Sequence, residues 1–208
     1  VENLIYTYGH RNMFGIAFHP ITGRAYITEN GPACNDEVNR LSAADNYGWG
    51  PAATCSTPPA PPANTNQDGP SPVMPIDWWT PTIAPTNAAF YTGTLLPHSR
   101  NDLMFGAYND ARLRDLALSA DGTTVVNESI LLTAPSGILD VEMGLDGFLW
   151  VTTASTIYRV VAAPTIAASF HLIAFASLPI LAMAAVSTLN PRFLPTSEPR
   201  RSRSLQKP

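Results

Sequence analysis

Residues whose types and spacing could do chemistry gather in the first quarter of the sequence. Between residues 9 and 49 stand four polar motifs, Gly9-His-Arg-Asn12, Glu29-Asn-Gly-Pro32, Asn35-Asp-Glu-Val-Asn39 and Asn46-Tyr-Gly-Trp49. The guanidinium of Arg11 is always charged and donates hydrogen bonds in a fixed fork, so it suits an oxygen that gains negative charge. Taken by itself, Arg11 fits a surface ion pair equally well, because residues 1–164 carry fifteen acidic side chains.

The elements that must position these motifs read as short β-strands. Phe14–Phe18 and Arg24–Thr28 flank a turn with Pro20 and Gly23, which is a hairpin pattern. Further β-prone runs, separated by Gly, Pro, Asn-Asp and Asp-Gly, cover residues 87–92, 103–108, 113–118, 125–132, 139–143 and 148–153. No stretch before residue 165 shows a convincing helical period. The sequence therefore predicts an all-β fold.

A weak internal repeat favours one all-β architecture. Ile16–Thr28 resembles Val141–Thr152, each a strand, a glycine-containing turn and a strand with an aromatic residue at the matching position, Tyr26 or Trp150. Repeated hairpins of this kind indicate propeller blades rather than a sandwich. The Pro-rich residues 51–75 form a long excursion, and such insertions often shape the site on one face of a propeller.

Composition and charge exclude several classes of protein. The 208 residues have a formal net charge of −4, with 13% charged residues and thirteen glycines. A collagen, a coiled coil and a highly charged disordered tail do not have this composition. No Lys/Arg patch precedes residue 190, so we expect no nucleic-acid partner.

The C-terminal part of the chain predicts a membrane anchor. Residues 165–189 contain no formally charged side chain, and about 20 apolar residues suffice to cross a bilayer. Four arginines and Lys207 follow, so the positive-inside bias places residues 190–208 in the cytoplasm. The predicted organisation is a β domain over 1–164, a transmembrane helix over 165–189 and a basic tail. A buried core helix is the alternative for the apolar run.

The two cysteines point to the same topology. Cys34 and Cys55 lie in a Pro/Ser/Asn-rich stretch, where an even pair forms a disulfide if the compartment is oxidising. Two reduced loop thiols are the alternative. A disulfide agrees with a domain on the extracellular or periplasmic side of the membrane.

Three segments in order resemble the glucose/sorbosone dehydrogenase family, whose members include aldose sugar dehydrogenases that use pyrroloquinoline quinone (PQQ). The first is Gly9–Asn12 followed by Phe14–Phe18, and the second runs through the motifs from Glu29 to Trp49. The third is Trp79–Pro85 with Ala89–Gly93. The resemblance implies the C-terminal half of a six-bladed β-propeller, because the family normally needs roughly twice this length.

The resemblance assigns cofactor contacts to residues at matching positions. Arg11 would lie against the quinone as the catalytic cation, and Asn12 would add an amide hydrogen bond. Asp36 matches a carboxylate near the cofactor, and Thr82 matches a hydroxyl contact to the quinone. Asn30 stands where the family commonly has glutamine or a similar polar residue.

The resemblance also implies two calcium ions. The carbonyls of Gly31 and Pro32 match the pair that holds the cofactor's Ca²⁺, and carbonyl oxygens are natural ligands of a hard cation. Glu37 and the carbonyl of Tyr47 match a structural calcium site. The plainer interpretations are a tight Gly-Pro turn and a solvated acidic loop.

The family's reaction would need a base from outside this sequence. In the family, a histidine from the first half of the propeller takes the proton of the sugar's anomeric hydroxyl, while the C1 hydride passes to the quinone. His10, His19 and His98 do not match that histidine. We expect them to be structural or surface residues.

The sequence departs from the family at three cofactor-binding positions. Asn109, Gly137 and Leu139 align with a lysine and two arginines that hold the acid groups of PQQ in the family. Two hypotheses follow. One is a membrane-tethered quinoprotein that oxidises aldoses at C1 and passes electrons to an unknown acceptor. The other is a non-catalytic, calcium-braced propeller that binds carbohydrate or protein.

Overall fold

The computed structural model describes residues 4–56, 59–161 and 185–188. These residues form three four-stranded antiparallel sheets, in each of which neighbouring strands follow one another along the chain. The first sheet contains β1 (Met13–Phe18), β2 (Ala25–Glu29), β3 (Asp36–Arg40) and β4 (Asp77–Trp79). The second contains β5 (Pro85–Phe90), β6 (Leu103–Ala107), β7 (Arg112–Leu118) and β8 (Val125–Thr133). The third contains β9 (Ile138–Met143), β10 (Leu149–Thr153), β11 (Ile157–Val161) and β12 (Ala185–Thr188).

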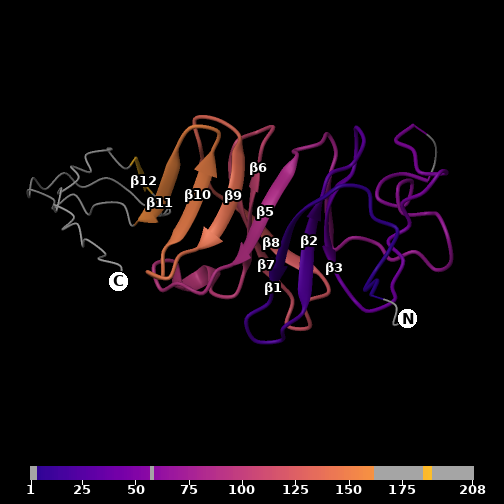
Figure 1. The fold of residues 1–208 in the computed structure, drawn as a ribbon, viewed down its shortest axis with the longest axis horizontal. Coiled ribbons are helices and arrows are strands. Elements are labelled where there is room, and N and C mark those ends of the chain that lie inside the picture. The colour runs from indigo at the N-terminus through magenta and orange to yellow at the C-terminus, as the bar shows by residue number, and fades with distance from the viewer. Residues whose placement is uncertain (1–3, 57–58, 162–184, 189–208) are drawn as a thin grey trace, which may run out of the picture.

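The three sheets lie side by side along the long axis of the molecule, and the all-β prediction is confirmed (Figure 1). The first strands of the sheets, β1, β5 and β9, contact one another in series. Between the first and second sheets, Tyr26 and Val38 pack with Phe90, Phe105 and Leu116. The second and third sheets enclose a separate core of ten buried side chains, which includes Met104, Leu113, Ile138, Val141 and Val151.

Buried threonines connect the three sheets. Thr28 on β2 donates its hydroxyl to the carbonyl of Thr86 on β5, 2.6 Å away. The hydroxyl of Thr86 lies 3.1 Å from the carbonyls of both Gly106 and Ile138, the latter on β9. A Cβ on Gly106 would lie 2.1 Å from Cγ2 of Ile138. The second and third sheets therefore approach too closely here for any side chain larger than glycine.

The predicted strands were mostly right, and the omissions have a physical cause. The hairpin is β1 paired with β2, and the six further runs correspond to β5 through β10. The strands β3, β4 and β11 were not predicted. β3 contains Asp36, Glu37 and Asn39, which are polar and yet buried, so its sequence lacks the alternation that marks a half-buried strand. Consecutive four-stranded meanders agree with the predicted propeller blades.

The prediction of a helix over residues 165–189 needs correction at its end. Residues 162–184, and the basic tail over 190–208, lie outside the described part of the chain. Residues 185–188 form β12, which pairs antiparallel with β11, because an edge strand offers free backbone donors and acceptors to another strand. Within the described ranges, no helix is long and apolar enough to cross a membrane. The predicted domain boundaries stay predictions.

We expect Thr86→Val to lower the free energy of unfolding by about 1–2 kcal/mol, because two buried carbonyls lose a hydroxyl partner. Urea unfolding followed by tryptophan fluorescence measures this change. Thr133→Val, at an exposed position on β8, is the matched control and should change stability by less than about 0.5 kcal/mol. Equal losses in the two variants would contradict the role given to Thr86.

Candidate functional site

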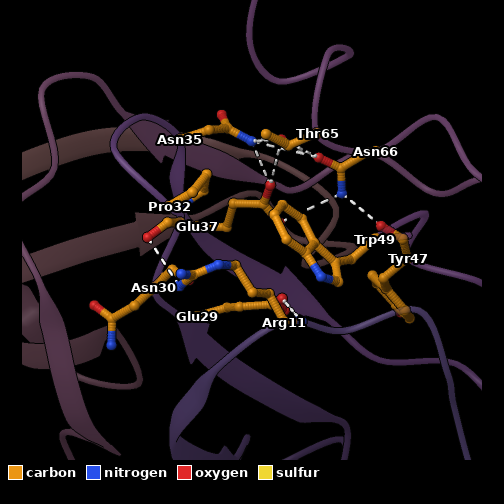
Figure 2. Close-up of a pocket in the computed structure, with 11 residues that line it drawn as sticks. Arg11, Glu29, Asn30, Pro32, Asn35, Glu37, Tyr47, Trp49, Thr65 and Asn66 are labelled. Carbon is orange, nitrogen blue, oxygen red and sulfur yellow. Dashed lines mark hydrogen bonds between the residues drawn. The ribbon is translucent and has the colours of Figure 1, made fainter. Parts of the chain in front are cut away.

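A small polar pocket lies at the end of the first sheet where the β2–β3 loop meets the excursion between β3 and β4 (Figure 2). We call it the Arg11 pocket. Eleven residues line it: Arg11, Glu29, Asn30, Gly31, Pro32, Asn35, Glu37, Tyr47, Trp49, Thr65 and Asn66. Residues as far apart in the sequence as Arg11 and Asn66 thus meet at one place. The pocket unites Arg11, Asn30, Gly31, Pro32, Glu37 and Tyr47 of the predicted site residues.

The excursion is fixed to the first sheet by covalent and apolar contacts. Cys34 and Cys55 form a disulfide with their Cα atoms 5.7 Å apart, as predicted. Ile27 on β2 packs with Leu41 and Tyr47 of the excursion in a small buried apolar cluster. These contacts hold the excursion over the polar end of β3, so that its backbone and side chains complete the pocket wall.

Arg11 precedes β1 and reaches across the mouth of the pocket. Its guanidinium donates to the carbonyls of Asn30 and Gly31 at 2.8 and 3.0 Å. The same group lies 5.4 Å above the ring of Trp49, within the range of a cation–π contact. The backbone N–H of Arg11 donates to the carboxylate of Glu29. Arg11 itself is exposed, so a positive charge faces solvent at the pocket mouth.

His10 and Glu29 form a buried pair behind Arg11. Nδ1 of His10 lies 3.0 Å from Oε2 of Glu29, and both side chains are 7% exposed. The His10 ring stacks on Tyr47 at 4.5 Å, and its Nε2 lies 2.9 Å from the hydroxyl of Thr7. Sequence reasoning missed Glu29 as a functional candidate and placed His10 among structural residues. Its place directly before the Asn-Gly-Pro turn was the one sequence feature that could have marked Glu29 as a candidate.

Glu37 stands at the centre of a buried polar cluster. The side-chain amide of Asn39 donates to its carboxylate at 2.9 Å, and the amide of Asn66 lies 3.4 Å from it. Asn35 and Thr65 contact the other carboxylate oxygen. Burial raises the pKa of Glu37 to about 7, although the hydrogen bonds from Asn39, Asn66 and Thr65 oppose that rise.

The donor set around Glu37 fits a hard cation such as Ca²⁺. The amide of Asn66 also donates to the carbonyl of Tyr47 at 2.7 Å, which brings that carbonyl to the same place as the carboxylate. Among the described residues, the amide oxygens of Asn35 and Asn39 are buried without a hydrogen-bond partner. Ca²⁺ takes carboxylate, amide and carbonyl oxygens.

Any such cation would be bound mainly by neutral oxygens. Over the described ranges, no group of three or more His, Cys, Asp or Glu side chains is placed to hold a metal ion. Glu37 would supply a carboxylate to the cation, and the surrounding amides and the carbonyl of Tyr47 would supply neutral oxygens.

Asp36 joins two loops. Its carboxylate accepts from the backbone N–H of Gly31 at 2.8 Å and from those of Ile83 and Ala84, both at 2.6 Å. Burial raises its pKa, and the three backbone hydrogen bonds and nearby Arg11 oppose this rise. Asp36 thus ties the β2–β3 loop to the β4–β5 loop. The predicted proximity of this carboxylate to a cofactor stays a prediction.

Asn12 and Thr82, the two remaining predicted residues, are not among the residues that line the Arg11 pocket. Asn12 is exposed, and its carbonyl accepts from the backbone N–H of Asn30 at 2.9 Å. Thr82 is half-buried in the β4–β5 loop, and its carbonyl accepts from the side chain of Asn109 at 3.1 Å.

The three positions that the resemblance aligns with family cations lie in or beside the second and third sheets. Asn109 is exposed in the β6–β7 loop, and Leu139 is 44% exposed on β9. Gly137 lies against Tyr108, since a Cβ there would be 2.5 Å from a ring carbon of that tyrosine. A long side chain at residue 137 would thus need Tyr108 to move.

The chain is similar in sequence and in fold to sugar dehydrogenases. Aldose sugar dehydrogenase YliI of Escherichia coli is 31% identical over 153 residues, which cover 72% of this chain and 40% of that protein. The soluble aldose sugar dehydrogenase of Escherichia coli in its apo form has a similar structure, with a TM-score of 0.59 and 28% identity. The match covers 74% of this chain and 43% of that one.

A further similar structure is the PQQ-bound form of the aldose sugar dehydrogenase of Streptomyces coelicolor. Its TM-score is 0.54 and its identity 26%, over 72% of this chain and 39% of that one. The chain thus spans less than half the length of these relatives. The profile of the family described as Glucose / Sorbosone dehydrogenase matches residues 1–161. The chain belongs to the glucose/sorbosone dehydrogenase family.

Proposed function

We propose that this chain is part of a PQQ-dependent sugar dehydrogenase that oxidises aldoses at C1. The observation that carries the proposal is the position of the Arg11 side chain, whose guanidinium faces solvent beside the carbonyls of Asn30 and Gly31. Membership of the family and the PQQ-bound relative support the choice of cofactor. When bound, PQQ supplies the acceptor for the hydride that leaves C1 of the sugar.

The residues of this chain would bind and polarise the cofactor. The guanidinium of Arg11 donates in a fixed fork, so it stabilises an oxygen that gains negative charge as the sugar is oxidised. Asn12, Asn30 and the hydroxyl of Thr82 would add neutral hydrogen bonds around it. The proton of the sugar hydroxyl would be taken by a base in the part of the protein outside this sequence.

Two Ca²⁺ ions complete the proposal. The carbonyls of Gly31 and Pro32 would hold the cofactor's ion, and the carbonyl of Gly31 can accept from Arg11 and bind a cation because it has two lone pairs. Glu37 and the carbonyl of Tyr47 would hold the second ion. The buried, unpartnered amide oxygen of Asn35 supports this second site, within the described residues.

A second candidate function is a non-catalytic propeller that binds carbohydrate or protein. The observation that favours it is the contact between Gly137 and Tyr108, because the family's cationic side chain would fit at this position only if Tyr108 moved. PQQ carries three carboxylates, and each lost charge-assisted hydrogen bond weakens its retention. The calcium-braced pocket would then serve the scaffold alone.

Architecture and location form the last part of the proposal. The three sheets would be half of a six-bladed propeller, which agrees with the exposed apolar face of β1 formed by Phe14, Ile16 and Phe18. The Cys34–Cys55 disulfide supports a location outside the cytoplasm, because disulfides persist in oxidising compartments. A tether formed by the apolar run after residue 164 would keep the domain at a membrane surface.

Arg11→Ala tests the catalytic assignment. We expect the intact protein, loaded with PQQ and Ca²⁺ and freed of excess, to lose the absorbance of the oxidised quinone when an aldose is added. Arg11→Ala should slow this reduction at least about 100-fold, as removal of a donor to a developing oxyanion does. The control is Arg112→Ala, another exposed arginine. Failure of the wild-type protein to retain PQQ at any Ca²⁺ concentration would favour the non-catalytic function.

Chelation tests the Glu37 calcium site. We expect EDTA to lower the melting temperature of the wild-type protein, because a cation bound only by the folded state stabilises it. Glu37→Gln should remove most of this response. Glu128→Gln is the control, since that carboxylate pairs with Arg114 in the second sheet. A response to EDTA that survives in Glu37→Gln would place the stabilising ion elsewhere.

The pH dependence of stability, measured with a chelator present to remove bound cations, tests the burial of the Glu37 carboxyl group. Burial raises the pKa of Glu37 from 4.5 to about 7, so the folded state holds this proton over a range in which the unfolded state has released it. The contribution of Glu37 to the free energy of unfolding therefore falls between about pH 4.5 and 7. We expect Glu37→Gln to gain about 2–3 kcal/mol relative to the wild type between pH 5 and 8. Urea unfolding of both proteins at pH 5 and pH 8 measures this gain. A difference in unfolding free energy that is the same at the two pH values would refute the prediction.

A further inference from the structure

We propose that Glu29, held in place by His10, is a positioning residue that sets where the guanidinium of Arg11 lies. The inference rests on the proposed function, since it gives Arg11 the role described above. Glu29 lines the pocket, but its side chain is only 7% exposed, so we assign it no direct contact with cofactor or sugar. It would act through the backbone of Arg11.

The backbone of Arg11 needs a hydrogen-bond partner to hold its position, because the residue is not held by burial in the core. The residue is exposed and precedes β1, and the register of the β1–β2 pairing shifts between Met13 and Gly15. The regular strand ladder thus begins after Arg11. The carboxylate of Glu29 accepts the Arg11 N–H in its place, and a hydrogen bond to a charged acceptor is roughly twice as strong as a neutral one.

The carboxylate of Glu29 is itself fixed from a second direction. Nδ1 of His10 lies 3.0 Å from its Oε2, and a carboxylate only accepts, so Nδ1 carries the proton in this contact. The imidazole is held by its stacking on Tyr47 and by the hydroxyl of Thr7. Neighbouring residues 10 and 11 are therefore both bonded to the same side chain at the end of β2.

Glu29 also connects Arg11 to the Glu37 cluster. The side-chain amide of Asn39 lies 3.4 Å from Oε2 of Glu29 and 2.9 Å from Oε2 of Glu37. One amide group thus bridges the carboxylate behind Arg11 and the carboxylate of the proposed cation site. A change at one carboxylate would therefore alter the hydrogen bonding of the other through the Asn39 amide, because the members of a buried network depend on one another.

A double-mutant cycle distinguishes positioning from a merely structural role. The intact protein would be compared with Glu29→Gln, Arg11→Ala and the double variant, with Glu128→Gln as the control for loss of a structural carboxylate. Two quantities would be measured: the dissociation constant for PQQ in saturating Ca²⁺ by equilibrium dialysis, and the hydrogen exchange of the Arg11 amide by NMR. His10→Gln provides a second variant if Glu29→Gln does not fold.

If Glu29 acts through Arg11, Glu29→Gln weakens PQQ binding about tenfold, the lower range for loss of a group that orients a ligand-binding residue. The same change adds little in the Arg11→Ala background, because coupled residues are not additive. Exchange of the Arg11 amide accelerates in Glu29→Gln and is unchanged in Glu128→Gln.

An equal loss of affinity in both backgrounds would overturn the inference, and so would an Arg11 amide whose exchange does not respond to Glu29→Gln. Failure of the wild-type protein to bind PQQ would instead count against the proposed function. The amide measurement needs no cofactor, so it would still decide whether Glu29 positions Arg11.

Discussion

The arrangement of the candidate site depends on the carboxylate of Asp36, which is buried and accepts three backbone N–H groups from two loops. A buried carboxylate is costly unless it is fully hydrogen-bonded, and here the donors are backbone groups of Gly31, Ile83 and Ala84. The β2–β3 loop is thereby fixed to the start of the second sheet. The carbonyls that Arg11 contacts belong to this loop, so their position follows from the bond between the sheets.

Apolar packing stabilises the middle of the sheets, whereas polar contacts stabilise the end near the site. The middle of each sheet is covered by aromatic and aliphatic side chains, while the end near the site buries Glu29, Glu37 and several asparagines. Such polar burial is stable only where partners are supplied, and the excursion supplies Thr65 and Asn66. The disulfide holds the excursion in the position where it can do so.

The sequence allowed most of the fold to be predicted, because strands such as β6 and β10 combine β-prone residues with turn residues at their ends. It did not allow β3 to be predicted, because both faces of this strand are buried and one of them consists of Glu37 and Asn39. A side-chain partner of Glu37, Asn66, lies 29 residues away in the excursion. For the site, family motifs located Arg11 and Glu37. The pairing of His10 with Glu29 depends on the register of β1 and β2 and was not visible in either motif.

The residues that line the Arg11 pocket, together with His10 and Thr7 behind it, all lie between residues 7 and 66, in the first sheet, its loops and its excursion. The positions that the resemblance aligns with the family's lysine and arginines lie in or beside the other two sheets, which enclose a separate core. The hydrogen bonds from Ile83 and Ala84 to Asp36 connect the two regions through the backbone. Among the described residues, the hydrogen bonds of the Arg11 and Glu29 side chains all stay within the first sheet and its loops, so a substitution at residue 109, 137 or 139 would remove none of them.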